Sequence, residues 1–104
     1  MAWHKVASSQ DVEEGNVIEV KVGETPIALY NIDGEFYATH NICTHAYACL
    51  HEGYVEDETI ECPLHQGIFD IKTGEALEGP VEEPLETYSV KREGEEIYIE
   101  VPEE

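Results

Sequence analysis

The chain has 104 residues, of which 41% are hydrophobic, and a formal net charge of −19 at pH 7. This length accommodates one domain, and the apolar content is too high for a disordered acidic tail. The negative charge repels phosphate groups and anionic lipid headgroups, so it argues against nucleic-acid and membrane-surface partners. It favours partners with basic patches, and we expect the free protein to be monomeric.

The N-terminal segment, residues 1–6, has no positively charged region followed by an apolar stretch, so a secretory signal is not expected. No apolar run approaches the ~20 residues that a membrane-spanning helix needs. We therefore expect a cytoplasmic protein. In that reducing compartment, an odd set of cysteines (Cys43, Cys49 and Cys62) argues against a disulfide scaffold and favours metal chemistry.

The hydrophobic pattern is mostly of period two, which is typical of β-strands. One helical turn is predicted at residues 9–15, capped by Ser9 and ended by Gly15. Residues 16–22 then alternate between apolar and polar, while residues 26–32 are continuously apolar, as in a strand covered on both faces. One face of the first of these strands carries Ile18, Val20 and Val22.

Two β-hairpins are predicted from dipeptides that contain glycine. Asp33-Gly34 lies between apolar runs, and this pair suits a type I′ turn because both central positions need positive φ. Glu93-Gly94 separates two alternating segments near the end of the chain. The strands that these turns join are expected at residues 26–32, 35–39, 88–92 and 96–101.

Between about residues 40 and 74 the alternation fades, and Cys, His, Gly and Pro become frequent. We therefore predict a single all-β domain over residues 1–104. Residues 1–39 and 75–104 are expected to form an antiparallel β sandwich or barrel-like framework. Residues 40–74 are expected to form a small, loop-rich subdomain carried on that framework.

Two short motifs in this loop-rich segment carry metal-binding side chains. They are Cys43-Thr44-His45 and Cys62-Pro63-Leu64-His65, so the full pattern is C-x-H-x16-C-x2-H. Two kinds of centre fit such donors: a tetrahedral zinc ion, or a [2Fe–2S] cluster in which two histidines replace two cysteines on one iron. The alternating order favours the cluster, because each motif can place its Cys on one iron and its His on the other.

The two motifs, together with the Asp70 that follows the second one, resemble the two boxes of Rieske-type ferredoxins. The chain as a whole is similar to the ferredoxin components of bacterial aromatic-ring dioxygenase systems. The resemblance implies one Rieske [2Fe–2S] cluster in the 40–74 subdomain. It also implies that Cys43 and Cys62 hold one iron and that His45 and His65 hold the outer iron, where electrons enter and leave.

The resemblance further implies a one-electron carrier rather than an enzyme. Such a protein shuttles electrons from an NAD(P)H-dependent flavin reductase to a terminal Rieske non-haem iron oxygenase that acts on an aromatic compound. Two alternatives remain open at this stage. One is a Rieske-fold subunit of a larger reductase, such as the small subunit of nitrite reductase, and the other is a Cys₂His₂ zinc structural module.

The sequence departs from respiratory-chain Rieske proteins at four positions. Those proteins carry an extra cysteine in each box and join the pair by a disulfide, whereas Ala48 and Leu64 stand at the matching positions here. They also use a Ser and a Tyr to donate hydrogen bonds to cluster sulfurs, whereas this chain has Gly67 and Phe69. Without these hydrogen bonds the reduced cluster is less stable than in the respiratory-chain proteins. We therefore expect a low reduction potential, on the order of −150 mV.

Other polar residues near the motifs are given more ordinary roles. We expect His40 to lie at the surface, His51 to be a loop residue and Cys49 to be a small buried hydrophobe. Acidic residues flank the loop-rich segment and are expected to form either a solvated rim or a docking surface for basic partners. These residues are Glu52, Glu56, Asp57, Glu58 and Glu61.

Overall fold

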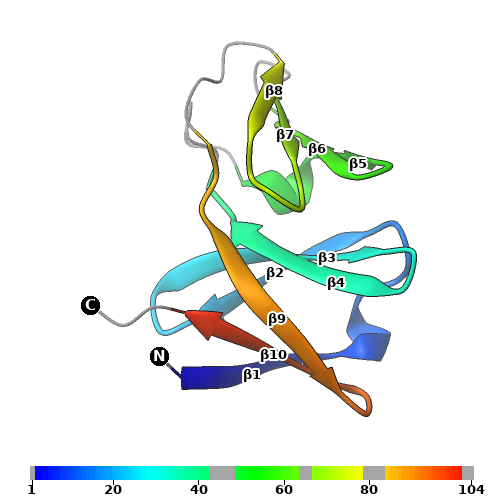
Figure 1. The fold of residues 1–104 in the computed structure, drawn as a ribbon, viewed down its shortest axis with the longest axis vertical. Helices are drawn as coiled ribbons and strands as arrows, with labels where there is room; N and C mark the ends of the chain where they lie inside the picture. The colour runs from blue at the N-terminus through cyan, green and yellow to red at the C-terminus, as the bar shows by residue number, and fades with distance from the viewer. Residues whose placement is uncertain (1, 43–48, 64–66, 79–83, 102–104) are drawn as a thin grey trace.

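The computed structural model describes residues 2–42, 49–63, 67–78 and 84–101, which form two antiparallel sheets (Figure 1). The large sheet has the strand order β1-β10-β9-β4-β3-β2, and the small sheet has the order β5-β6-β7-β8. The large sheet comprises β1 (Ala2–Ser8), β2 (Val17–Val22), β3 (Thr25–Ile32), β4 (Glu35–His40), β9 (Thr87–Glu93) and β10 (Glu96–Val101). The small sheet comprises β5 (Tyr54–Glu56), β6 (Thr59–Glu61), β7 (Ile68–Asp70) and β8 (Ala76–Glu78).

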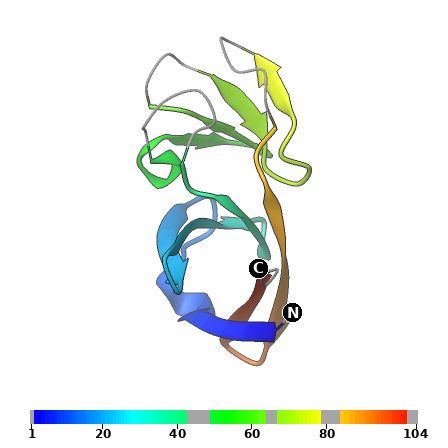
Figure 2. The same cartoon turned by 90° about the vertical axis from the view of Figure 1, so that its left-hand side faces the viewer.

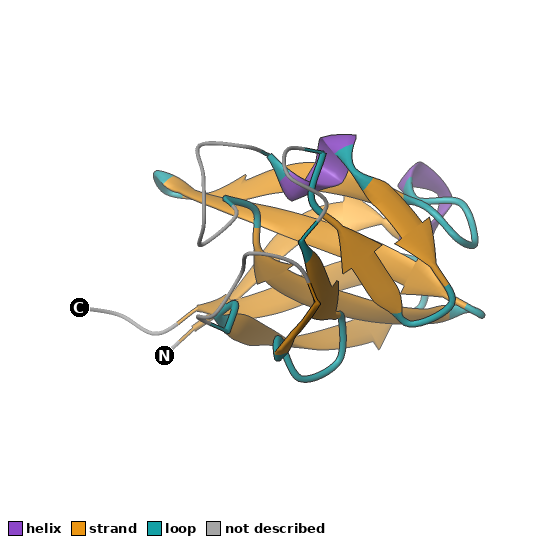
Figure 3. Ribbon diagram, turned by 90° about the horizontal axis from the view of Figure 1, so that it is seen from above, coloured by secondary structure: helices purple, strands orange, loops and turns teal. Residues whose placement is uncertain are grey.

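The prediction of an all-β fold is confirmed. Within the described ranges the helical segments are two 3₁₀ turns, η1 (Ser9–Asp11) and η2 (Leu50–Glu52), as Figure 3 shows. The large sheet curls into a near-barrel in which the edge strands β1 and β2 approach each other, and the small sheet sits above it (Figure 2). No helix in the described part of the chain is long and apolar enough to cross a membrane.

Strand β3 lies between two hydrophobic cores. Its odd-numbered Ile27 and Leu29 pack inside the large sheet. Its even-numbered Ala28, Tyr30 and Ile32 pack into a second core, which the small sheet shares. Because successive side chains of a strand point to opposite faces, this placement explains the continuous apolar run and confirms that the strand is covered on both faces.

The turn at Asp33-Gly34 has the predicted geometry. Asp33 has φ 52° and Gly34 has φ 87°, so both central residues are left-handed, and Ile32 pairs with Glu35 across the hairpin. The Asn31 side chain supports the turn by accepting a 3.0 Å hydrogen bond from the Gly34 N–H. The β3–β4 hairpin is therefore fixed by local turn chemistry.

The second predicted hairpin, β9–β10, is also present, with its turn one residue later than expected. Glu93 pairs with Glu96, so the two turn residues are Gly94 and Glu95. Gly94 has φ 63°, a conformation that glycine adopts without a steric penalty. The glycine is therefore the first of the two turn residues, whereas the sequence placed it second.

The predicted helical turn at residues 9–15 is shorter than expected, and its cap is a different residue. The turn ends at Asp11, and Ser8 rather than Ser9 is the N-cap. The Ser8 N–H donates a 2.9 Å hydrogen bond to the Asp11 carboxylate. Val12 then adopts an extended conformation, because it is 1% exposed and packs into the core of the large sheet.

The small sheet differs from the loop-rich segment that the sequence pattern indicated. Each of its four strands has three residues, a length too short to show a clear alternation of apolar and polar residues. Strand β8 pairs with β7 in this sheet, although its residues fall in the 75–104 range assigned to the framework. Ala76 accounts for the difference, because it packs against the core shared by the two sheets. The division of the chain into framework and subdomain stays a prediction.

Tyr88 of β9 places a titratable hydroxyl at the edge of the large-sheet core. Burial raises the pKa of Tyr88 from 10.0 to about 12. The negative charge of Glu86 and a hydrogen bond with its side chain add smaller contributions in the same direction. Because the folded-state pKa is the higher one, the neutral phenol stabilises the fold fully below pH 10.0, and this contribution is lost as the pH rises through about 12.

We predict that Tyr88→Phe keeps the packing and reduces the alkaline loss of stability by about 1 kcal/mol, allowing for partial solvation of the hydroxyl. The measurement is urea unfolding at pH values on either side of this range. Tyr54→Phe is the control, because the Tyr54 side chain is 68% exposed. Equal pH dependence in the wild type and Tyr88→Phe would contradict the prediction.

Candidate metal centre

The structure describes one of the four predicted cluster ligands, Cys62. The other three, Cys43, His45 and His65, lie outside the described residues. The candidate site is therefore built from Cys62 and from the residues at which the chain enters and leaves each motif. These flanking residues are Asn41, Ile42 and Cys49 for the first motif, and Cys62, Pro63 and Gly67 for the second.

Cys62 follows β6 directly and is 0% exposed. It belongs to the core that β3 shares with the small sheet, together with Ile60 and Phe69. Its N–H donates a 2.7 Å hydrogen bond to the Gly67 carbonyl, which extends the β6–β7 hairpin and closes the base of the second motif. The cysteine is therefore rooted in apolar packing on one side and held by a backbone hydrogen bond at its own amide.

The base of the first motif is closed in a similar way. Ile42 and Cys49 form an antiparallel bridge, and the Leu50 N–H donates a 2.7 Å hydrogen bond to the Asn41 carbonyl. The Asn41 side chain adds a third link, because its Oδ1 accepts a 2.9 Å hydrogen bond from the His51 N–H. Asn41 is 0% exposed, so this asparagine holds the two ends of the motif together from inside the protein.

The bases of the two motifs meet in one core. Leu50 leaves the first motif and is 0% exposed in the same cluster as Cys62. Gly53 makes a second contact between the two segments. Its Cα lies so close to the Glu61 carbonyl that an added Cβ would overlap that oxygen. The segment that leaves the first motif therefore packs directly on the strand that leads into Cys62.

Sequence reasoning missed Asn41 and Gly53. Each makes its contacts with residues that lie several positions or more away in the chain, and a sequence pattern does not reveal such partners. A buried asparagine directly after an apolar strand is a weak signal that it satisfies backbone groups at a loop base. The glycine before β5 signals a close backbone approach but does not reveal the partner.

The other polar residues near the first motif have more specific roles than expected. His40 is half-buried rather than at the surface, and its Nδ1 accepts a 3.1 Å hydrogen bond from the Ile42 N–H. His51 lies in η2, where its ring contacts the Asn41 amide. Cys49 is half-buried with polar neighbours, and burial, followed by the charges of Glu52 and Glu19, raises the pKa of its thiol.

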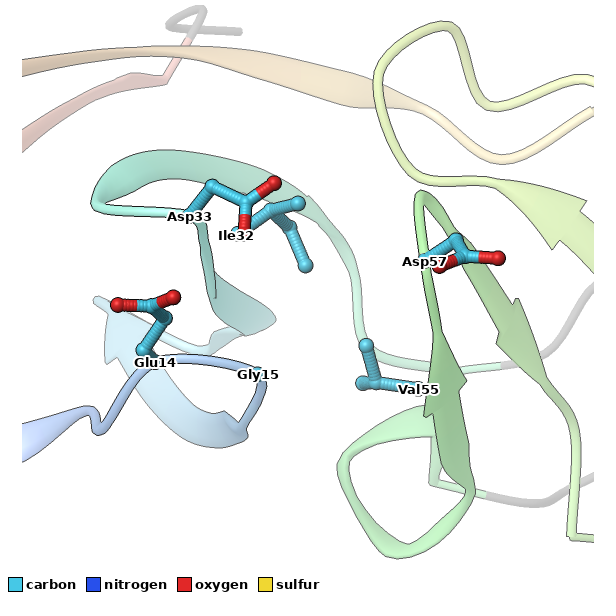
Figure 4. A pocket seen from close by; sticks show the side chains of 6 residues that line it. All are labelled: Glu14, Gly15, Ile32, Asp33, Val55 and Asp57. Carbon is cyan, nitrogen blue, oxygen red and sulfur yellow. The ribbon is translucent and has the colours of Figure 1, made fainter.

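A surface pocket between the two sheets does not have the chemistry of such a site. The pocket has a volume of about 230 Å³. Figure 4 shows side chains that line it, among them the acidic Glu14, Asp33 and Asp57 and the apolar Ile32 and Val55. No thiol or imidazole lines this pocket among the described residues. An iron–sulfur cluster needs thiolate donors, so the pocket is not a candidate for it.

The donor set at the two motifs does fit an iron–sulfur cluster. Cys62 presents its sulfur from an apolar core, a surrounding that limits the access of water on that side. The sequence supplies a second cysteine and two histidines in the same pair of motifs. Two thiolates and two imidazoles are the ligands of a Rieske centre.

A protein-family model described as "Rieske [2Fe-2S] domain" matches residues 2–89. The chain belongs to this family. Its cofactor is accordingly a Rieske [2Fe–2S] cluster, as expected, and the alternative of a zinc structural module at these motifs is set aside.

Full-length relatives narrow the class of protein. Over 97 residues the chain is 46% identical to the ferredoxin component of the naphthalene 1,2-dioxygenase/salicylate 5-hydroxylase systems of Ralstonia sp, and the match covers 93% of both chains. A solved complex of reduced oxygenase and oxidized ferredoxin in carbazole 1,9a-dioxygenase contains a chain with a TM-score of 0.88 and 38% identity. That match covers 93% of this chain and 91% of the other. The protein is a Rieske-type ferredoxin, an electron carrier rather than an enzyme.

The nitrite reductase alternative receives support at the level of the fold. The small subunit of a putative NADPH nitrite reductase superposes with a TM-score of 0.83, and the match covers 97% of this chain and 100% of the other. The sequence identity is 22%, so this likeness shows a shared fold and no more.

Proposed function

We propose that this ferredoxin accepts single electrons from an NAD(P)H-dependent flavin reductase and delivers them to a terminal Rieske non-haem iron oxygenase that acts on an aromatic compound. The observation that carries the proposal is the 46% identity, across 93% of both chains, to a ferredoxin of a naphthalene dioxygenase system. The solved complex of a related ferredoxin with its oxygenase supports direct transfer between the two proteins. A cytoplasmic location is part of the proposal, because NAD(P)H is supplied there.

The proposed ligands are Cys43 and Cys62 for one iron, and His45 and His65 for the other. The alternating order of the motifs and the anchoring of Cys62 support this set. When bound, the cluster gains or loses one electron at a time. The whole chain, residues 1–104, is proposed to be one domain in which residues 40–74 hold that cluster.

The described residues contribute to this function by closing the bases of the two motifs. Two buried anchors, the Cys62 backbone and the Asn41 side chain, close the bases of the two motifs. Holding ligands through buried contacts of this kind is how proteins preorganise a site, and it reduces the rearrangement that accompanies the gain of an electron.

EPR of the dithionite-reduced protein tests the ligand set. Mixed Cys and His ligation gives a lower average g value than ligation by four cysteines, and we expect the lower value. Cys49→Ser is the control, because Cys49 is the remaining cysteine and is not a proposed ligand. A spectrum of the all-cysteine type, or loss of the signal in Cys49→Ser, would overturn the assignment.

A reconstituted electron-transfer chain tests the function. The probe is the reductase and the oxygenase of a naphthalene dioxygenase system, supplied with NADH and naphthalene. We expect that product forms when this ferredoxin replaces the natural one. If the reductase does not reduce the ferredoxin, or if the reduced ferredoxin does not transfer electrons to the oxygenase, the proposed function is wrong.

We predict a low reduction potential, on the order of −150 mV, because Gly67 and Phe69 cannot donate side-chain hydrogen bonds. Phe69 is 0% exposed and packs in the core beside Cys62. A donor worth ~1 kcal/mol more in the reduced state corresponds to roughly 40 mV for one electron, so Gly67→Ser is expected to raise the potential by about that amount. Redox titration of both proteins provides the measurement, and a clearly positive wild-type potential would contradict the prediction.

We also predict that electron transfer to the oxygenase slows as the salt concentration rises. Residues 40–78 contain one lysine, Lys72, and no arginine, and Lys72 already lies 3.2 Å from Glu58. The small sheet therefore offers mainly negative charge to a basic partner, which accelerates encounter at low ionic strength. We expect a fall of about tenfold in the second-order rate between low and moderate salt.

A pair of charge reversals locates the effect. Glu56→Lys lies on the small sheet, and Glu100→Lys makes the same charge change on β10 of the large sheet. Slower transfer in Glu56→Lys than in Glu100→Lys is the expected result in stopped-flow measurements. Equal rates in the two variants would show that net charge, rather than docking on the small sheet, controls the encounter.

A further inference from the structure

Three metal-binding side chains that the iron centre does not use lie together beside the first motif. They are Glu19 of β2, Cys49 at the bridge to Ile42, and His51 of η2. One carboxylate oxygen, the thiol sulfur and one imidazole nitrogen all lie within 4.8 Å of one another. Glu19 is exposed, and the other two are half-buried, so the group is open to an ion from solvent.

A buried amide orients two of these three side chains. Asn41 Nδ2 donates a 2.9 Å hydrogen bond to Glu19 Oε2 and lies 3.0 Å from His51 Nδ1. These contacts hold the Glu19 carboxylate and the His51 ring in place beside the thiol. Metal sites commonly fix their ligands through such outer hydrogen bonds, and the fixed orientation lowers the entropy lost on binding.

The charges around the thiol favour a cation. Glu19 and Glu52 are the charged groups that act on Cys49, and both are acidic. Together with burial they hold the thiol in its protonated form, and no basic side chain in the described part of the structure is among the groups that shift its pKa. A divalent cation would supply the positive charge that this cluster lacks.

We propose that Glu19, Cys49 and His51 form a second metal site, which binds one Zn²⁺ ion with water as the fourth ligand. Zinc accepts thiolate, imidazole and carboxylate donors in a tetrahedral arrangement, whereas Mg²⁺ and Ca²⁺ prefer oxygen donors alone. Ligand atoms of a tetrahedral zinc site are roughly 3.5 Å apart, so the side chains need to close by about 1 Å.

Binding of the ion releases one proton from the protein. The Cys49 thiol releases one proton to solvent as the zinc–sulfur bond forms. His51 binds as a neutral imidazole through one ring nitrogen, so it releases no proton. The ion would then tie β2 to the residues that leave the first motif, and it would stabilise the base of that motif.

Zinc-edge X-ray absorption of the cluster-loaded protein with one equivalent of Zn²⁺ tests the site. It is read separately from iron, and we expect one sulfur at about 2.3 Å with nitrogen and oxygen donors at about 2.0 Å. The visible absorption of the iron–sulfur cluster is expected to stay unchanged, which distinguishes this site from the motifs that hold iron. Calorimetry in two buffers is expected to report release of one proton per ion.

Variants identify the ligands by calorimetry with Zn²⁺. Cys49→Ser is expected to weaken binding at least a hundredfold, and His51→Gln and Glu19→Gln at least tenfold. His4→Gln and Glu24→Gln repeat the same changes on β1 and on the β2–β3 turn, and we expect them to bind zinc as the wild type does. Zn²⁺ is also expected to protect wild-type Cys49 from iodoacetamide, a readout that needs no variant.

Four results would overturn the proposal. They are no zinc binding by the wild type at micromolar concentrations, zinc bound without sulfur, binding that Cys49→Ser leaves intact, and displacement of iron by the added zinc. None of these results bears on electron transfer to the oxygenase, which the reconstituted chain tests separately.

Discussion

Gly53→Ala is expected to lower the free energy of unfolding by about 3 kcal/mol and to reduce the fraction of protein that holds a cluster. A Cβ on Gly53 would overlap the Glu61 carbonyl oxygen and would come 3.2 Å from the Leu50 carbonyl oxygen. Both obstacles are backbone atoms, which cannot turn aside as a flexible side chain can. Since Glu61 directly precedes Cys62, the strand that shifts is the one that positions a proposed iron ligand.

Gly94→Ala provides the matched control for this change. No atom lies within 4 Å of a Cβ at Gly94, but its φ of +63° disfavours an alanine there. This conformational strain is worth about 1 kcal/mol, and the β9–β10 turn is not part of the cluster site. Urea unfolding gives the stability, and visible absorption per mole of protein gives the cluster content. If Gly53→Ala were as stable and as fully loaded as Gly94→Ala, the close approach to Glu61 would have no consequence.

The features predicted best from the sequence are those with local causes. The Asp33-Gly34 turn follows from the φ requirements of two adjacent residues, and the structure has positive φ at both. The burial of β3 follows from an uninterrupted run of apolar side chains. The alternating order of the cysteine–histidine motifs favoured a Rieske cluster over a zinc ion, and the family match confirms the cluster.

The features that were missed depend on contacts between distant parts of the chain. Strand β1 pairs with β10, and Trp3 lies opposite Glu100. Nothing in the sequence of the first eight residues predicts that β10 is the pairing strand. The Asn41 amide meets Glu19 across 22 positions of sequence. The small sheet is built from strands too short for periodicity, and its stability comes from packing on β3. The assignment of Cys43, His45 and His65 as ligands stays a prediction based on motif order.

Asn41→Ala is expected to lower the free energy of unfolding by about 3 kcal/mol, because it removes several hydrogen bonds of a fully buried side chain at once. The His51 N–H loses its acceptor, and Glu19 Oε2 and His51 Nδ1 lose their contact with the amide. The backbone links from Asn41 to Leu50 and from Ile42 to Cys49 remain, so the two ends of the first motif stay joined. We therefore expect a folded protein that loses its cluster faster than the wild type.

Asn31→Ala separates this local effect from a general loss of stability. Asn31 is also buried, but its side chain bonds the Val12 carbonyl and the Gly34 N–H instead of the first motif. Both variants are expected to be destabilised to a similar degree in urea. The rate at which the visible absorption fades in the presence of a chelator should rise several-fold in Asn41→Ala and little in Asn31→Ala. If the two rates rose equally, cluster retention would follow overall stability, and Asn41 would have no specific role in closing the first motif.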